Sequence, residues 1–263
     1  MDQELIFRLS FFLGIFSALS LWEVKRPRRK LNKDKLKRWL NNLGLTFFNS
    51  FLLRLVFPAA AAGAAILAQE KGWGLFNQFF APEILTGLFS IIVLDFVIYS
   101  QHVIFHKIPL FWRLHRMHHT DLDIDVTTGA RFHPVEIILS MVIKIGVVLA
   151  LGAPAWSVVV FEVILNGTSM FNHSNIYIRP AIDRFLRLVV VTPDMHRVHS
   201  ALIKETDSNF GFNFPWWDRM LRTYRDQPEA GHDKMTIGLA NYRDPKWLKF
   251  RWMLLTPFSS HYR

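Results

Sequence analysis

The sequence contains no cysteine, and this absence excludes several classes of protein. Disulfide-stabilised folds, thiolate zinc sites, cysteine-ligated iron–sulfur clusters and cysteine nucleophiles all require that residue. Glycine-rich phosphate loops and dinucleotide-binding motifs are also absent from the sequence, so no flavin or nicotinamide site is predicted. Any metal must therefore be held by nitrogen or oxygen atoms, and histidine, with 11 residues, is the candidate ligand.

Acidic residues are also few: 21 Asp and Glu stand against 31 Lys and Arg, which gives a formal net charge of +10. At the same time, 51% of the residues are hydrophobic and 14% are aromatic. High apolarity with a basic excess is typical of a membrane protein whose basic face lies against anionic lipid headgroups. A basic chain can also bind nucleic acid, but the long apolar runs favour the membrane, and no nucleic-acid partner is expected.

Four apolar stretches predict membrane helices. The first lacks a small-residue cleavage site and precedes a basic block, so we interpret it as a span rather than a signal peptide. Pro58 predicts a kink in the second stretch. Gly152 to Pro154 interrupt the fourth, which predicts a helical hairpin that either spans twice or re-enters the membrane. The stretches are Leu5–Trp22, Leu43–Ala68, Ile84–Tyr99 and Ile137–Leu165.

The distribution of basic residues predicts the orientation. Lys25–Arg38 carries nine Lys and Arg in fourteen residues, whereas Lys71 is the only basic residue between the second and third spans. The positive-inside rule places the basic block in the cytoplasm. Counting the spans then puts residues 102–133 and 173–199 on the same side. We predict an all-α integral membrane bundle of about 3–5 membrane helices, with a cytoplasmic helical cap carrying the histidines and little or no sheet.

Seven histidines form three short boxes. Residues three or four apart share one helix face, so each box can direct its imidazoles to one place. Three histidines within five residues pack poorly and repel one another when protonated, whereas neutral imidazole is the form that binds metal. Val103 follows the first histidine, so a zincin motif is absent. The boxes are His102 and His106; His115, His118 and His119; and His196 and His199.

Two further histidines, His133 and His173, lie where the predicted hairpin enters and leaves the membrane. Each is a candidate ligand, with a purely structural role as the alternative. Asp95 precedes His102 on the same helical stripe and is predicted to accept a hydrogen bond from a ligand N–H. His232 and His261 have no histidine nearby and are not expected to bind metal.

Eight or nine imidazoles are too many for one ion but suit two ions with four or five nitrogens each. An all-imidazole set suits iron, zinc, copper or nickel. The sequence pattern leaves the choice of metal open.

The boxes and their surroundings resemble the fatty acid hydroxylase / sterol desaturase superfamily, in particular its bacterial members. The resemblance covers roughly residues 84–225 and is specific because it extends well beyond the histidines. The matching stretches are His118–Asp121, Asp125–Pro134, Asn172–Asn175, Thr192–His199, Glu205–Gly211, Trp217–Arg219 and Thr223–Tyr224.

This resemblance implies a membrane-bound oxidoreductase with two iron ions, which uses O2 to hydroxylate or desaturate a lipid C–H bond. Zinc is an alternative occupant in purified material. The lipid would be fatty acyl, sterol or related, and electrons would come from an external electron-transfer protein. The seven box histidines would be catalytic, and His133 and His173 would complete the metal ligands. The chain would divide into N-terminal membrane helices with the basic loop (1–82), a catalytic domain (83–225) and a C-terminal tail (226–263).

The last box departs from the family pattern. It is usually His-X2-His-His, but Ser200 follows His199 here, and the spacing to Glu205 suggests that one residue is missing. Either His199 takes the role of one member of the pair or the site has one ligand fewer. A catalytically impaired lipid-binding relative is therefore the main alternative. A membrane-surface hydrolase and a bis-histidine haem carrier are weaker ones, because His-Glu-X2-His is absent and the histidines are clustered.

Overall fold

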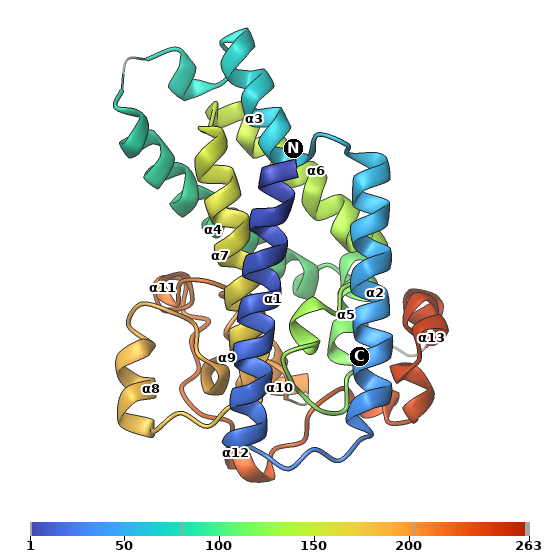
Figure 1. Cartoon of the computed structure of the whole chain (residues 1–263). Coiled ribbons are helices and arrows are strands. Elements are labelled where there is room, and N and C mark those ends of the chain that lie inside the picture. Colours follow the sequence, from blue (N-terminus) through green and yellow to red (C-terminus); the bar gives the residue numbers. More distant parts are fainter. Residues whose placement is uncertain (1, 80, 202, 261–263) are drawn as a thin grey trace.

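The computed structural model describes residues 2–79, 81–201 and 203–260, which form helices joined by loops (Figure 1). Within these ranges there is no β-strand, only two isolated β-bridges, and the all-α prediction is confirmed. The α-helices are α1 (Asp2–Lys25), α2 (Lys35–Val56), α3 (Ala60–Lys71), α4 (Glu83–Lys107), α5 (Pro109–His119), α6 (Pro134–Leu151), α7 (Ala155–His173), α8 (Pro180–Leu186), α9 (Pro193–His199), α10 (Ile203–Thr206), α11 (Trp216–Met220), α12 (Gly231–Lys234) and α13 (Phe250–Leu255). The 3-10 helices are η1 (Leu75–Asn77), η2 (Thr128–Ala130), η3 (Ala240–Tyr242), η4 (Pro245–Leu248) and η5 (Thr256–Phe258).

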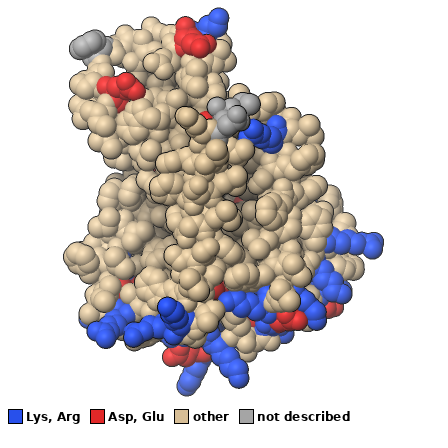
Figure 2. Space-filling model, viewed as in Figure 1, with Lys and Arg blue, Asp and Glu red and all other residues tan. Residues whose placement is uncertain are grey.

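Four segments of the described chain are long and apolar enough to cross a membrane, and each overlaps one of the four apolar stretches of the sequence, the fourth over its first half only. Large apolar side chains are exposed on their outer faces, among them Ile6, Phe47 and Leu55. Figure 2 shows that Lys and Arg gather at the lower end of the molecule, whereas the surface above carries only scattered charges. The chain is therefore an integral membrane protein. The segments are Gln3–Lys25, Lys35–Asn77, Glu83–Lys107 and Pro134–Leu151.

Two helix breaks lie where the sequence places them. Pro58 separates α2 from α3, because proline cannot supply the backbone N–H that continues a helix. At the end of α6, Gly152 adopts φ 67° and reverses the chain into α7. A side chain there would lie 2.7 Å from the Trp73 carbonyl oxygen, so glycine suits both the conformation and the space. The predicted helical hairpin is thus α6 and α7.

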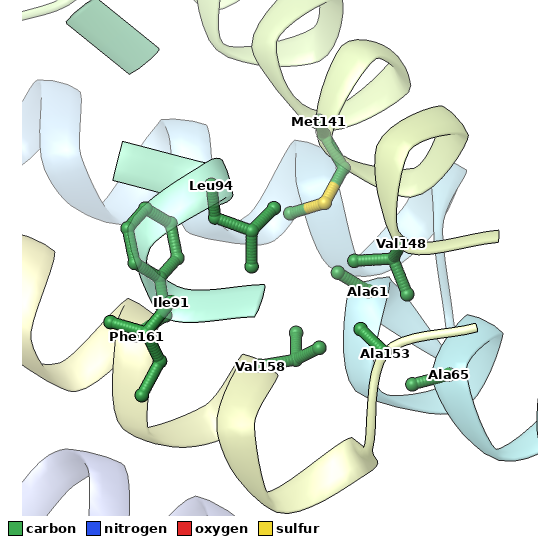
Figure 3. Close-up of a cluster of buried hydrophobic side chains, with 9 residues drawn as sticks. All are labelled: Ala61, Ala65, Ile91, Leu94, Met141, Val148, Ala153, Val158 and Phe161. Atoms are coloured by element: carbon green, nitrogen blue, oxygen red, sulfur yellow. The ribbon is translucent and has the colours of Figure 1, made fainter. Parts of the chain in front are cut away.

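The membrane core lies between α3, α4, α6 and α7. Small residues of α3 let these helices approach closely, as is common where lipid surrounds the bundle. At another close approach, Gly87 of α4 lies against the Trp156 ring of α7, where a Cβ would be only 2.1 Å from the ring. Figure 3 shows the side chains that fill this core, which are Ala61, Ala65, Ile91, Leu94, Met141, Val148, Ala153, Val158 and Phe161.

The short helices form a cap, which we define as α5 with residues 174–201 and 203–260, at the lower end of the bundle (Figure 1). A buried arginine of α2, Arg38, ties the bundle to the loop that follows α5. Its Nε and Nη1 lie 2.8 Å from Asp121 and 2.6 Å from Asp125. Burial raises the pKa of Asp121, but the charges of Arg38 and Arg131 outweigh it and lower the pKa to about 2. The carboxylate is therefore ionised in the folded protein.

The C-terminal segment packs on the histidine-bearing part of the cap. Arg131 donates to the carbonyl oxygen of Trp247 at 2.9 Å, and Arg116 of α5 donates to that of Thr256 at 2.8 Å. Residues 226–260 therefore contribute to the environment of α5. The division of the chain at residues 82 and 225 stays a prediction.

The Arg38 network leads to a stability prediction. Arg38→Met would leave two buried carboxylates without their cation, which costs about 3–5 kcal/mol. We expect the purified variant in detergent to have a lower thermal unfolding midpoint. The measurement is size-exclusion chromatography of samples heated to increasing temperatures. Lys37→Met is the matched control because that side chain is 82% exposed. Equal midpoints for Arg38→Met and the wild type would contradict the assignment.

Candidate metal centre

Eight buried histidines converge in two groups. In each group, the imidazole nitrogens that could bind metal all lie within 4.8 Å of one another. The histidines come from helices far apart in the sequence, α4, α5, α7 and α9, which meet where the bundle joins the cap. The five-histidine group contains His102, His106, His115, His119 and His199, and the three-histidine group contains His118, His173 and His196.

Helix geometry explains how neighbouring histidines separate into two groups. On α5, His115 and His119 are four residues apart and share one face, whereas His118 is rotated by about 100° from His119. On α9, His196 and His199 are three residues apart and also belong to different groups. The expectation that each box directs all its imidazoles to one place is therefore confirmed for His102 and His106 and wrong for the other two boxes. The groups adjoin one another, since the ring centroids of His118 and His119 are 5.0 Å apart. Each of these two helices thus serves both groups.

The distances between Nε2 atoms match those expected around a metal ion. Nitrogens bound at about 2.1 Å to one ion are about 3.0 Å apart at right angles and about 3.4 Å apart at tetrahedral angles. In the five-histidine group, His119 Nε2 is 3.2 Å from both His106 Nε2 and His115 Nε2. In the three-histidine group, His173 Nε2 is 3.0 Å from both His118 Nε2 and His196 Nε2.

The opposite ring nitrogens define the tautomers. A carbonyl oxygen only accepts hydrogen bonds, so an Nδ1 beside it must carry the proton, and Nε2 keeps its lone pair for a metal. The Nε2 of His199 has no hydrogen-bond partner among the described residues, as expected for an atom reserved for an ion. Four histidines donate to carbonyl oxygens: His102 to Phe210 (2.7 Å), His118 to Arg131 (3.2 Å), His173 to Ser169 (2.7 Å) and His199 to Ser208 (2.7 Å).

Burial favours the neutral form of four of the cap histidines. It lowers the pKa of His118, His119 and His196 well below the ordinary value, and the neighbouring imidazoles lower it further. For His199, burial and the adjacent His115 lower the pKa to about 3. Neutral imidazole is the form that binds metal, so the donor set fits one or two transition-metal ions.

A polar loop between α10 and α11 supplies two of the accepting carbonyls. Asn209, at φ 54°, lies between Ser208 and Phe210, whose carbonyl oxygens receive the His199 and His102 protons. The Asp218 carboxylate accepts from the backbone N–H of Phe210 at 2.8 Å and of Gly211 at 2.9 Å. The polar stretches beside the last box therefore shape the loop that orients two of the histidines.

The structure does not bring His133 into either group. It precedes α6 as the N-cap, where its Nδ1 accepts from the backbone N–H of Val135 at 3.3 Å. Its Nε2 faces the Leu254 carbonyl oxygen at 3.3 Å. Both ring nitrogens are thus occupied by backbone groups, which corrects the expectation that His133 belongs to the ligand set. His232 also lies outside both groups, 3.8 Å from Asp194, and His261 falls outside the described residues.

The expectation for Asp95 is wrong. Its carboxylate accepts from the indole N–H of Trp217 at 2.7 Å, and its other oxygen has no hydrogen-bond partner among the described residues. Glu136, on the first turn of α6, lies beside the site instead, with Oε1 2.7 Å from His115 Nδ1. Its place two residues after Pro134, where one of the stretches that resemble the family ends, was the available signal.

The last box contributes one histidine to each group. His199 completes the five-histidine group, and His196 joins the three-histidine group, where His173 lies between it and His118. Ser200 ends α9, and its carbonyl oxygen accepts from Gly238 at 3.1 Å. The shortened box thus serves both groups, and the three-histidine group has fewer imidazoles than the other.

A cavity of about 730 Å³ leads from the membrane helices to the histidines. Its walls come from α1, α2, α3, α4, α6 and α7, and its inner end reaches His102 and His115. Two aromatic rings line this end: Phe132 stacks on His118 at 4.8 Å between centroids, and the Phe212 centroid is 5.1 Å from that of His102. A volume of this size is typical of a site for a small organic ligand.

The fold and site together define a helical membrane protein with two adjoining polyhistidine groups at the end of an internal cavity. The fatty acid hydroxylase family model matches residues 87–223, more than half of the chain, and the protein belongs to this family.

Three relatives of known function are similar along most of the chain. The ornithine lipid hydroxylase OlsE of Rhizobium tropici is 23% identical over 90% of this chain and 72% of its own length. The cholesterol 25-hydroxylase of Rattus norvegicus is 24% identical over 86% of this chain and 77% of its own. The corresponding Mus musculus protein is 25% identical over 81% of this chain and 71% of its own. No solved structure matches the chain.

The grouping predicts which histidines retain metal. His173→Ala and His196→Ala should be equally damaging, each lowering bound metal by about one ion per chain, because each removes one of three clustered imidazoles. His118→Ala should do the same, and all three variants should still insert into the membrane. Metal content of the purified proteins, measured by inductively coupled plasma mass spectrometry, is the test.

His133→Ala and His232→Ala are the matched controls and should keep wild-type metal content. Unchanged metal in His118→Ala or His173→Ala would show that the three-histidine group binds none. Inserting a histidine between Val198 and His199 tests the shortened box: higher metal retention would mean that the present box is defective, and lower retention that its spacing works.

Proposed function

We propose that the protein is a membrane-bound, O2-dependent di-iron oxidoreductase that hydroxylates a C–H bond of a lipid. The observation that carries this proposal is the cavity, which runs between membrane helices and reaches His102 and His115 of the five-histidine group, beside the three-histidine group. Two ions match two groups, with the five-histidine and three-histidine groups as their protein ligands. His133 is not included.

The chemistry of the substrate favours iron among the metals that accept imidazole. An alkyl C–H bond offers no proton that a side chain can remove, so a redox-active metal must supply the reactivity. Zinc is not redox-active and cannot do so. Bound iron would supply the activation of O2. Overall, R–H, O2, two electrons and two protons give R–OH and water, so one oxygen atom enters the C–H bond and the other is reduced. Desaturation would instead remove a second hydrogen from the neighbouring carbon.

The residues of this chain would bind and orient the lipid. The cavity opens among helices that face the bilayer, so an apolar chain can enter without crossing water. Phe132 and Phe212 line the inner end and would hold the chain beside the histidines, away from solvent. Glu136 and the backbone carbonyls would keep the imidazoles in one orientation while the substrate reacts.

The electrons must come from outside the chain. The sequence offers no flavin, nicotinamide or iron–sulfur motif, so we propose an external electron-transfer protein. Lys and Arg gather at the cap end of the surface in Figure 2, which supports a cytoplasmic cap by the positive-inside rule. The histidines would then receive electrons from the cytoplasmic side.

The relatives support a lipid substrate and favour hydroxylation over desaturation. They are named for hydroxylation of an ornithine lipid and of cholesterol, so the substrate class for this chain covers fatty acyl, sterol and related lipids.

The three-histidine group keeps a second candidate open, a lipid-binding relative with an incomplete metal site. The two candidates differ in metal content, because the oxygenase requires two irons per chain and the lipid binder does not.

The test is oxygen consumption by the purified protein. Reconstituted with iron, a reductant-coupled electron donor and a total lipid extract, the wild type should bind about two irons and consume O2 with formation of a lipid 16 mass units heavier. His118→Ala should do neither, because it removes a ligand.

His232→Ala, outside both groups, should retain activity. Comparison of lipids from a deletion strain and a complemented strain by mass spectrometry would identify the product. A wild type that binds one iron and consumes no O2 with any extract would favour the lipid-binding alternative.

A further inference from the structure

The cavity has a charged end in addition to its histidine end. Glu162 of α7 accepts from Arg8 of α1 and from Lys144 of α6, each at 2.7 Å. Arg8 also donates to Glu4 at 2.8 Å, and all four side chains line the cavity together with Arg54. Charged residues within membrane helices are costly and usually face an interior with a function.

The charges at this end do not balance. Arg54 lines the same cavity, and the third lining carboxylate, Glu136, lies beside His115 instead. The remaining charged side chains of the lining are three cations, Arg8, Arg54 and Lys144, and two carboxylates, Glu4 and Glu162, an excess of one positive charge. Nη2 of Arg8 has no hydrogen-bond partner among the described residues. A cluster that only tied α1, α6 and α7 together would need neither an excess cation nor a position on the cavity wall.

The spacing of residues along the helices gives the distance between the charged end and the histidine end of the cavity. Lys144 lies eight residues beyond Glu136 on α6, or about 12 Å at 1.5 Å per residue. Glu162 lies eleven residues before His173 on α7, or about 16 Å. Both helices therefore separate the charged end from the histidine site by a distance that part of an extended alkyl chain can bridge.

We propose that Arg8, Lys144 and Arg54 form a subsite for the anionic end of the lipid substrate, a carboxylate or a phosphate. The apolar chain extends from this subsite along the cavity, and the carbon that reaches the histidines is determined by its distance from the anionic group. This inference rests on the proposed function, because it takes the bound lipid to be the substrate. Binding of an anion at the subsite can nevertheless be measured without turnover.

The test compares three amphiphiles with the same alkyl chain: palmitate, hexadecyl phosphate and hexadecanol. Their binding to the purified full-length protein in uncharged detergent is measured by native mass spectrometry or by displacement of a fluorescent fatty acid. The wild type should bind at least one of the two anions about tenfold more tightly than the alcohol, a difference of about 1.4 kcal/mol, because only the anions can pair with the excess cation. The tighter anion identifies the class of headgroup.

Two substitutions separate charge from structure. Lys144→Met removes the excess charge and should abolish the preference for anions while leaving hexadecanol binding unchanged. The double variant Lys144→Met/Glu162→Gln restores an excess of one cation and should recover the preference. Lys37→Met, on the exposed surface, is the matched control for loss of a lysine and should bind like the wild type.

Three outcomes would overturn the subsite: equal binding of all three amphiphiles to the wild type, equal loss of all three in Lys144→Met, or a double variant weaker than the single one. The last two would identify a structural ion-pair cluster. Failure of the proposed function is distinguishable, because a protein that prefers anions but consumes no O2 keeps the subsite and loses the oxygenase. A protein that oxidises lipids but does not prefer anions keeps the proposed oxygenase function and contradicts the subsite.

Discussion

Eight buried imidazoles are held in two groups, in which neighbouring Nε2 atoms lie as close as 3.0 to 3.2 Å, and they repel one another unless a metal or a proton lies between them. Burial disfavours the proton, as the lowered pKa of His119 shows. This crowding is the constraint on which the rest of the structure depends. Four helices must meet at one place, and each ring must be turned so that its lone pair faces inward. The backbone carbonyls of Arg131, Ser169, Ser208 and Phe210 achieve this by accepting the opposite N–H. Much of the polar sequence between the boxes serves that second requirement.

Local patterns in the sequence predict the features that depend on local geometry. The four-residue spacing of His102 and His106 places both in one group, as a helix requires, and Pro58 and Gly152 break helices because of their own backbone chemistry. His173 was a candidate ligand because it follows the predicted hairpin on the side of the boxes, and it lies between His118 and His196. These inferences needed no knowledge of how the helices pack.

Tertiary packing decides what the sequence pattern left open. Asp95 shares a helical stripe with His102, but Trp217 approaches from another helix and takes its carboxylate. Glu136 reaches His115 only because α6 crosses α5, and no spacing in the sequence encodes that crossing. His133 is close to the site along the chain, but its position as the N-cap of α6 engages both of its nitrogens with the backbone. The charged end of the cavity likewise joins three helices that the sequence does not pair.

Two short helices, α5 and α9, each carry histidines for both groups. The offset between the groups is therefore copied from the repeat of the α-helix itself, about 100° and 1.5 Å per residue. This spacing is a property of the helical backbone, so repacking of neighbouring side chains does not change it. The dimensions of the cavity are not fixed in this way, because its length and width depend on apolar contacts between separate helices. The molecule thus combines a centre of fixed dimensions with a substrate chamber whose dimensions single substitutions can change.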